Sequence, residues 1–428
     1  MSGKTGSELP ASATRQYHAY VGVGSMGCVI LLLRIFSARF EPAWLYASFI
    51  LLAYSVPVMF LEFFVGRACF YADNLSFSAA SPSIKRTAIK LVGLYASLGL
   101  VAALYWLFPE YHGAFYDHYF KAFRFFVPLL IVIAPLYIYH VDKHMVKPLD
   151  GYWHLGTIFF MHGNRADFEK IRQHLLGWFV KGFFLPLMFT YLCQDLNRVI
   201  GATLIETWSF HEVLSVAIDL LYFIDVAIAV AGYVFSMRLI DTHIRSCEPT
   251  TTGWVVALVC YQPFYSMVGD QYLAYSEGRS WSFWLAAFPV VGWIWGAVTL
   301  VLVFIYAWAT VVFGLRFSNL TNRGIITSGP YRWTKHPAYL AKNISWWMIS
   351  MPFMSQFGVL EALRHCLLLG LLNLCYFLRA KTEERHLEAD PVYREYSDWI
   401  NKHGLFSNIV SLVRFCSATI RARSERQS

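Results

Sequence analysis

The stretch VLSVAIDLLYFIDVAIAVAGYVF, residues 213–235, contains only two charged side chains, Asp219 and Asp225. A helix needs about 20 mostly apolar residues to cross the hydrocarbon core of a bilayer. This stretch is long and apolar enough, so it predicts a membrane-spanning helix. The whole chain has the same character: 57% of its 428 residues are hydrophobic and 14% are charged, whereas a soluble domain averages about 45–50% apolar and about 25% charged residues.

Similar apolar stretches recur along the sequence and predict an all-α fold, a polytopic transmembrane helix bundle of about ten spans. The predicted spans are residues 20–36, 43–65, 88–108, 122–139, 176–193, 213–235, 253–268, 288–314, 338–354 and 363–377. A short polar loop, residues 238–252, follows the sixth span. It divides the chain into an N-terminal membrane region of about six helices (residues 1–245), whose role the sequence does not identify, and a C-terminal four-helix region with a polar tail (residues 246–428).

Lysine and arginine residues gather in alternate loops, as they do on the cytoplasmic side of membrane proteins. Loops between these basic loops are poorer in Lys and Arg and include the acidic stretch around Glu110 and Asp117. This alternation predicts that both termini are cytoplasmic. The formal net charge of +8 lies in loops between apolar runs, not on one soluble face, so no nucleic acid partner is expected.

A polar motif, RGIITSGPYRWTKHPAY, follows the eighth span at residues 323–339. Pro337 suits the first turn of a helix, where its missing N–H group is not needed. The loop before it is basic, and the N-terminus of a helix attracts anions. His336, Tyr339 and Asn343 are spaced to lie on one face of that helix. The motif therefore predicts a site for a carboxylate-bearing ligand.

A second polar motif, RAKTEERHL, ends the last predicted span at residues 379–387. Arg379, Glu383 and Leu387 repeat every four residues, so they share one helical face. Because the last two spans form a hairpin, both motifs are expected at the same membrane surface, in a cleft suited to a zwitterionic cofactor with a sulfonium cation. Either motif alone is also typical of interfacial anchors; their combination favours a functional site.

The pattern G-P-Y-x-x-x-(R/K)-H-P-x-Y, a membrane hairpin and R-x-x-x-E-E-x-x-L followed by Y-x-x-Y resembles the isoprenylcysteine carboxyl methyltransferase family and its phospholipid N-methyltransferase relatives. The resemblance covers about residues 315–401. It implies an integral multi-pass methyltransferase that uses S-adenosyl-L-methionine and faces the cytoplasm with its active site. Its partners would be membrane lipids and a lipophilic, lipid-like or prenylated methyl acceptor, methylated on a carboxylate oxygen or an amine nitrogen.

The resemblance also implies roles for individual residues. Arg379 and Glu383 would be catalytic, with Arg379 facing the methyl acceptor. The cofactor would be bound by Arg323, Gly324, Ile325, Ile326, Tyr331, His336, Pro337, Ala338, Tyr339 and Glu383.

The chain departs from the family pattern at three places. Lys335 stands where the family usually has Arg, which keeps the charge but loses the bidentate fork. Ala341 replaces a frequent Gly, and the Glu-Glu segment reaches Tyr393 by a shorter route through Asp390-Pro391. These differences bear on the substrate more than on the cofactor.

Two other functions fit parts of the sequence. Membrane sterol reductases share a related R-H-P-x-Y hairpin but use NADPH; they typically carry a Cys-Lys-Tyr-Gly-rich segment where this chain has Glu383-Glu384. A non-enzymatic alternative is a transporter or lipid-handling bundle with a degenerate hairpin. The intact His336, Arg379 and Glu383 argue against degeneracy.

Three further features have structural explanations that compete with functional ones. Gly22, Gly24 and Gly27 match GxGxxG, but within a predicted membrane helix small residues usually permit close packing. His140 and His144 could share a helix face, yet no tight ligand motif repeats and no metal site is predicted. Four ionisable residues lie within apolar runs and indicate either a transport pathway or structural pairing: Glu62, Lys181, Asp219 and Asp225.

Overall fold

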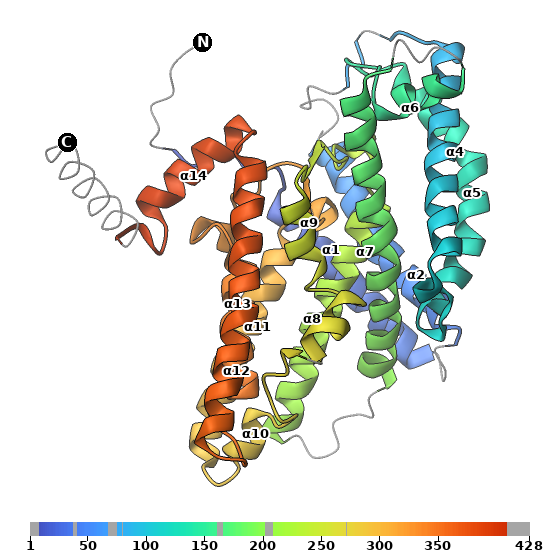
Figure 1. Ribbon diagram of the computed structural model, residues 1–428. Coiled ribbons are helices and arrows are strands. Elements are labelled where there is room, and N and C mark those ends of the chain that lie inside the picture. Colours follow the sequence, from blue (N-terminus) through green and yellow to red (C-terminus); the bar gives the residue numbers. More distant parts are fainter. Residues whose placement is uncertain are drawn as a thin grey trace, which may run out of the picture.

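The computed structural model describes residues 8–36, 41–66, 75–78, 80–160, 166–201, 209–270 and 272–408. These residues are mainly helical (Figure 1), so the predicted all-α bundle is confirmed. The long helices are α1 (Gln16–Phe36), α2 (Ala43–Phe60), α4 (Ile84–Leu107), α5 (Asp117–Asp142), α7 (Phe168–Gly201), α8 (Phe210–Val234), α11 (Pro289–Val311) and α13 (Val359–Leu387). Shorter helices are α6 (Gly151–Phe159), α9 (Thr251–Leu258), α10 (Trp281–Trp284), α12 (Pro337–Ser350) and α14 (Pro391–His403).

Strands β1 (Ser246–Cys247) and β2 (Thr321–Asn322) form an antiparallel pair in which Ser246 lies opposite Asn322. This pair joins the loop after α8 to the loop after α11.

Eight helices of the described part are long and apolar enough to cross a membrane, where the sequence predicted about ten spans. The predicted ninth span is α12, whose 14 residues extend only about 21 Å at 1.5 Å per residue, less than the hydrocarbon thickness of about 30 Å. The predicted seventh span is broken: it contains the 8-residue helix α9 and the start of a separate five-residue helical segment, Ser266–Asp270. Helix α9 ends before Pro263, which lacks the N–H group that a continuing helix needs.

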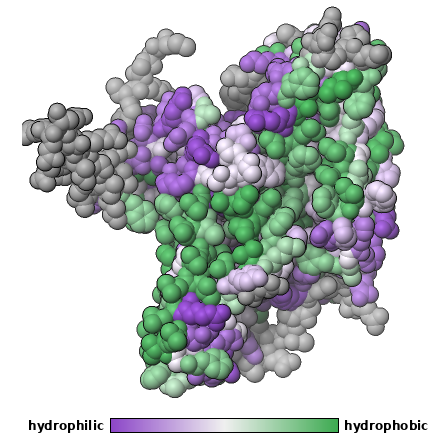
Figure 2. Space-filling model, in the orientation of Figure 1, coloured by the Kyte–Doolittle hydropathy of each residue, from purple (hydrophilic) through white to green (hydrophobic). Residues whose placement is uncertain are grey.

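The core lies between α1, α2, α7 and α8, where large aromatic side chains are fully buried. Tyr54, Phe184, Phe223 and Tyr233 are no more than 2% exposed, and the rings of Phe184 and Tyr233 stack at 5.8 Å. Apolar side chains also cover much of the outer surface, whereas hydrophilic ones gather around α14 (Figure 2). An apolar outer surface is what helices in contact with lipid require.

Helices α4 and α6 approach one another backbone to backbone. A Cβ atom added at Gly93 of α4 would lie 2.0 Å from the carbonyl oxygen of Tyr152, and one added at Gly156 would lie 2.0 Å from that of Ile89. Glycine is therefore required at both positions for this packing distance.

We expect Gly93→Ala to destabilise the protein by about 1–3 kcal/mol, because an added methyl group in a packed interface forces the backbone apart. Gly99→Ala on the same helix is the control, since its Cβ would meet no atom within 4 Å. Thermal unfolding in detergent measures both variants. Equal melting temperatures would contradict the close packing of α4 on α6.

One end of the bundle collects the polar motifs. Tyr306 and Thr310 of α11 contact Asp225 of α8, so these two helices run parallel and end at the same surface. Trp295 of α11 bonds to Met348 of α12, and Tyr339 of α12 bonds to Glu383 of α13. The start of α12 and the end of α13 therefore lie at the surface where α8 and α11 end.

We expect this surface to be cytoplasmic, because the Lys- and Arg-rich loops belong to it. A reporter fused after Ser428 should then be cytoplasmic, and one inserted near Tyr116, between α4 and α5, should lie on the opposite side. Accessibility of the reporter to a membrane-impermeant reagent measures the orientation. An external C-terminus would contradict it.

Candidate active site

The start of α12 and the end of α13 are joined by two polar contacts. The Tyr339 hydroxyl donates a hydrogen bond of 2.9 Å to Glu383 Oε2. His336 Nε2 lies 3.1 Å from Glu384 Oε1, and its ring stacks on that of Tyr339 at 5.5 Å. The antiparallel hairpin thus brings together the two polar motifs, which are more than 40 residues apart in sequence.

The loop before α12 is shaped by glycines with positive φ angles. Gly324 (φ 108°) and Gly329 (φ 61°) adopt left-handed conformations that other residues rarely tolerate. The N–H of Gly324 donates to the Asn322 side chain (2.8 Å), and the Asn322 amide donates to Asp390 (2.9 Å) just before α14. These bonds hold the loop against the C-terminal helix.

Helix α14 also closes over this loop through its tyrosines. The Tyr396 hydroxyl donates to the carbonyl oxygen of Tyr331 (2.7 Å). Tyr393 is 4% exposed, and its hydroxyl has no hydrogen-bonding partner in the described part of the chain. A buried polar atom without a partner is costly. Burial raises the pKa of Tyr331 well above its usual range, and the charge of Glu383 acts in the same direction, so Tyr331 stays neutral.

A cavity of about 90 Å³ lies between the hairpin, the end of α11 and the segment after it. Six of the residues predicted for the site line it: Tyr331, His336, Ala338, Tyr339, Arg379 and Glu383. Its other lining residues, which sequence reasoning did not assign to the site, are Tyr261, Tyr306, Thr310, Phe313, Phe317, Ser318, Asn319, Lys335, Lys342 and Tyr376.

Arg379 is the buried cation of this cavity, with only 6% of its surface exposed. Its Nη2 donates to Asn319 Oδ1 (2.6 Å), and Tyr261 Oη lies 3.4 Å from both Nη atoms. The guanidinium also lies 5.1 Å from the centre of the Tyr339 ring and 5.8 Å from that of Tyr376. No carboxylate of the described residues forms an ion pair with it. The positive charge is therefore desolvated and held by neutral groups alone.

Lys342 is a second cation in the same cavity. Its ammonium group lies 5.3 Å from the ring centres of Tyr306 and Trp346 and 5.5 Å from that of Tyr376. Tyr306 in turn donates a hydrogen bond of 2.6 Å to the buried carboxylate of Asp225. Asp225 is thus paired within the bundle. Of the two explanations for the intramembrane charges, a transport pathway or structural pairing, this contact agrees with structural pairing.

Five of the residues predicted to bind the cofactor do not line this cavity. Arg323 is 3% exposed, and its guanidinium donates to the carbonyl oxygens of Thr242, Gly232 and Phe317. These bonds tie the loop to the end of α8. Ile325 and Ile326 pack into an apolar cluster with Tyr393 and Tyr396 of α14. Gly324 and Pro337 also lie outside the lining.

The N-terminal segment covers the same loop, a contact that no pattern in the sequence indicated. The N–H of Ala13 donates to the carbonyl oxygen of Ile325 (2.9 Å), and the Thr327 hydroxyl donates to that of Pro10 (2.7 Å). A Cβ atom at Gly324 would lie 2.8 Å from that of Ala13. The first residues of the described chain therefore fix part of the loop predicted to bind the cofactor.

Some of the remaining sequence features have structural partners. Gly22 packs against α2, because a Cβ there would lie 2.6 Å from Val58. Glu62 pairs with His18 at 2.8 Å. His140 and His144 lie 5.4 Å apart, and no group of three or more His, Cys, Asp or Glu residues in the described part could hold a metal ion.

One comparison with known proteins finds a match in the C-terminal part of the chain. Residues 290–389 match the model of the isoprenylcysteine carboxyl methyltransferase (ICMT) family. The match begins with α11, includes the hairpin α12–α13 and ends after Glu383-Glu384, so it contains every predicted site residue. No curated protein and no solved structure matches the chain. The C-terminal part of the chain is therefore similar to membrane methyltransferases.

Proposed function

We propose that the protein is an integral membrane methyltransferase that uses S-adenosyl-L-methionine to methylate a carboxylate of a lipophilic acceptor. The observation that carries the proposal is the buried guanidinium of Arg379, which forms no ion pair with a described carboxylate. A buried charge without a counter-ion is strongly unfavourable. An acceptor carboxylate would neutralise it and accept hydrogen bonds from its planar fork.

The charges of the cavity favour oxygen over nitrogen as the methylated atom. Arg379, Lys342 and Lys335 line it, and Glu383 is its single acidic lining residue. Cations repel an ammonium group and attract a carboxylate, most strongly where water is scarce. This argument favours O-methylation over the N-methylation of the phospholipid-type relatives.

The residues around the hairpin fit a zwitterionic cofactor. Glu383 is 41% exposed at its side chain, so it has room to accept from the ammonium group of a ligand and to balance a sulfonium charge. The Tyr393 hydroxyl is an unpaired hydrogen-bonding atom behind the loop, and Tyr393 does not line the cavity. The cavity of about 90 Å³ is smaller than the roughly 300–1,000 Å³ of ligand pockets, so we expect the loop or α14 to move when the cofactor binds.

The positions of these residues indicate what each of them contributes to methyl transfer. When bound, S-adenosyl-L-methionine supplies an electrophilic methyl group on sulfur, which passes to the acceptor oxygen while the C–S electron pair remains on sulfur. Arg379 holds the acceptor carboxylate in line, and Tyr339 with His336 fixes Glu383-Glu384 at the cofactor side. Such alignment contributes more to the rate than acid–base chemistry here, because a carboxylate nucleophile has no proton to lose.

Binding and product analysis test the proposal. The detergent-purified protein should bind S-adenosylhomocysteine and not NADPH in calorimetric titrations. With methyl-labelled cofactor and a lipid extract, the labelled product should release methanol in alkali, as an ester does and an N-methyl group does not. Binding of NADPH alone would identify a reductase instead, and binding of neither ligand would favour a non-enzymatic bundle.

A further inference from the structure

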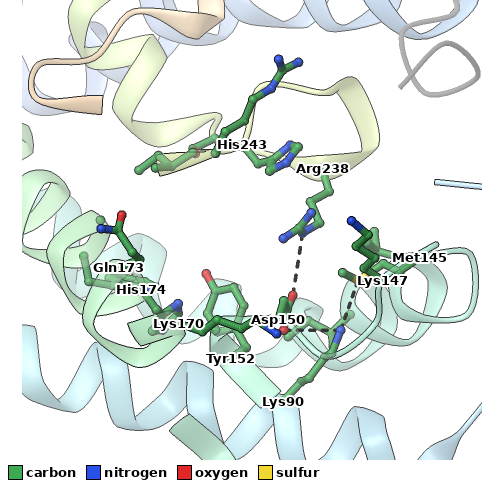
Figure 3. A pocket seen from close by; sticks show the side chains of 18 of the residues that line it. Lys90, Met145, Lys147, Asp150, Tyr152, Lys170, Gln173, His174, Arg238 and His243 are labelled. Atoms are coloured by element: carbon green, nitrogen blue, oxygen red, sulfur yellow. Dashed lines mark hydrogen bonds and ion pairs between the residues drawn. The ribbon is translucent and has the colours of Figure 1, made fainter. Parts of the chain in front are cut away.

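A second cavity, larger than the one at the hairpin, lies in the N-terminal region. It has a volume of about 550 Å³, which falls within the range of small-molecule sites. Its walls come from the start of α4, the end of α5, α6, the first half of α7 and residues 236–246 (Figure 3). These elements meet at the surface where α8 ends, so the cavity opens on the same side as the candidate active site.

Positive charge dominates the lining. Two acidic residues, Asp142 and Asp150, face six Lys and Arg residues: Lys90, Lys147, Lys170, Lys181, Arg238 and Arg245. Figure 3 shows side chains of both faces directed toward the space between them.

The two carboxylates are already engaged at the base of the cavity. Asp142 pairs with the buried Lys90 (2.8 Å) and with Arg86 (2.7 Å). Asp150 lies 3.5 Å from Lys90 and 3.7 Å from Arg238, and its side chain caps α6 through the N–H of Trp153. Two of the other lining cations pair with carboxylates outside the lining: Arg245 with Asp241 (3.0 Å) and Lys170 with Asp167 (3.7 Å).

Lys181 is the lining cation with the fewest compensating polar contacts. It lies on the face of α7 that lines the cavity, and its ammonium group is 5.5 Å from the centre of the Trp178 ring. No hydrogen bond or ion pair joins it to another residue among those the structure describes. Lys147, which is exposed at the rim, has no ion pair with a described residue either. Two cations thus face the cavity without a counter-ion.

The residues around His243 show the same excess of positive charge. Burial holds the pKa of this imidazole well below its usual range, and the positive charges of Arg238, Arg245, Arg316 and Arg323 lower it further. His243 is therefore neutral near pH 7 and adds no positive charge to this space.

Aromatic and apolar side chains complete the walls. Tyr137, Tyr152 and Trp178 line the cavity together with Ile138 and Val141. A site that combines several cations with apolar walls at a membrane surface suits an anion that carries an organic group. A phosphate group fits the charge best, because it carries up to two negative charges and three strong acceptor oxygens.

We propose that this cavity is a binding site for a phosphate ester, with Lys181 contacting the phosphate group. The ester could be the headgroup of an anionic lipid or a soluble phosphate ester, since both present the same group. The proposal does not depend on methyl transfer at the hairpin.

Binding of phosphatidic acid in detergent micelles tests the site. Wild-type protein should bind it, should bind phosphatidylcholine at least tenfold more weakly, and should lose affinity as ionic strength rises. Lys181→Met should weaken binding about tenfold or more, because a hydrogen bond to a charged group is lost. Lys181→Arg keeps the charge and should retain most of the affinity. This result would show that the position tolerates a substitution.

Lys85→Met is the matched control, because Lys85 is exposed at the same surface and does not line the cavity. Competition by glycerol 3-phosphate would assign the site to soluble esters, and its failure to compete would assign it to lipid headgroups; both support the proposal. Equal binding by wild type and Lys181→Met, with both folded by thermal unfolding, would overturn it. So would the absence of binding to any phosphate probe.

Discussion

Arg379→Lys should lower the rate of methyl transfer to a lipid extract by about 100-fold, because a slight misplacement of the reacting atoms has an effect of that order. Expression and the affinity for S-adenosylhomocysteine should stay unchanged. The arginine fork contacts Asn319 and Tyr261 and still has N–H groups to offer an acceptor. A lysine ammonium is a point charge that cannot keep these contacts and also bind a carboxylate in a fixed plane.

The competing explanation makes the opposite prediction. If Arg379 only anchored α13 at the membrane surface, lysine would replace it with almost no effect, because a lysine side chain also reaches the headgroups. The burial of Arg379 among tyrosine rings already argues against an anchor, since an anchor places its charge in water.

A matched control comes from the other end of the same helix. Arg364 is 54% exposed and pairs with Glu361, so Arg364→Lys should leave activity unchanged. Thermal unfolding separates a loss of fold from a loss of alignment. Full activity of a folded Arg379→Lys protein would contradict the acceptor-binding role and would leave the proposed site without a residue that orients the carboxylate.

The sequence could predict the hairpin contacts because helical periodicity fixes which side chains share a face. His336 and Tyr339 lie on one face of α12, and Glu383 follows Arg379 by one turn of α13. Once two such helices run antiparallel, their polar faces meet at one surface. This argument needs no knowledge of the rest of the fold, and the hydrogen bond between Tyr339 and Glu383 agrees with it.

The partners of Arg379 could not be predicted in this way. Asn319 and Tyr261 are 60 and 118 residues away in sequence, and both lie in irregular segments outside the long helices. Their positions depend on how the loops after α9 and α11 pack, and hydrophobic periodicity carries no information about that packing. The covering of Ile325 by Ala13 is a contact of the same kind.

Arg323 illustrates a different limit. An arginine in a basic loop beside a helix start is a reasonable candidate for binding an anion. In the structure its guanidinium donates to backbone carbonyl oxygens at the end of α8 and in neighbouring loops. Unpaired carbonyls at helix ends need such donors, but the sequence does not reveal which arginine supplies them.

His336→Ala should reduce the affinity for S-adenosylhomocysteine by about 100-fold, because a hydrogen bond to a charged group contributes about 1.5–3 kcal/mol and a tenfold change corresponds to about 1.4 kcal/mol. The imidazole has three contacts to lose: it bonds to Glu384 (3.1 Å), its Nδ1 lies 4.0 Å from Glu383 Oε2, and its ring stacks on that of Tyr339 at 5.5 Å. Without it, Tyr339 and the Glu383-Glu384 pair lose the group that orders them at the cofactor side.

Calorimetric titration of the detergent-purified variant measures this effect. His403→Ala is the control, because His403 is exposed on α14 and its ring stacks only on Trp399 of the same helix. That variant should bind as wild type does. If His336→Ala, folded by thermal unfolding, bound S-adenosylhomocysteine as tightly as wild type, the cofactor would have to lie elsewhere. The hairpin would then hold its polar residues for structural reasons, and Arg379 would need a different anionic partner.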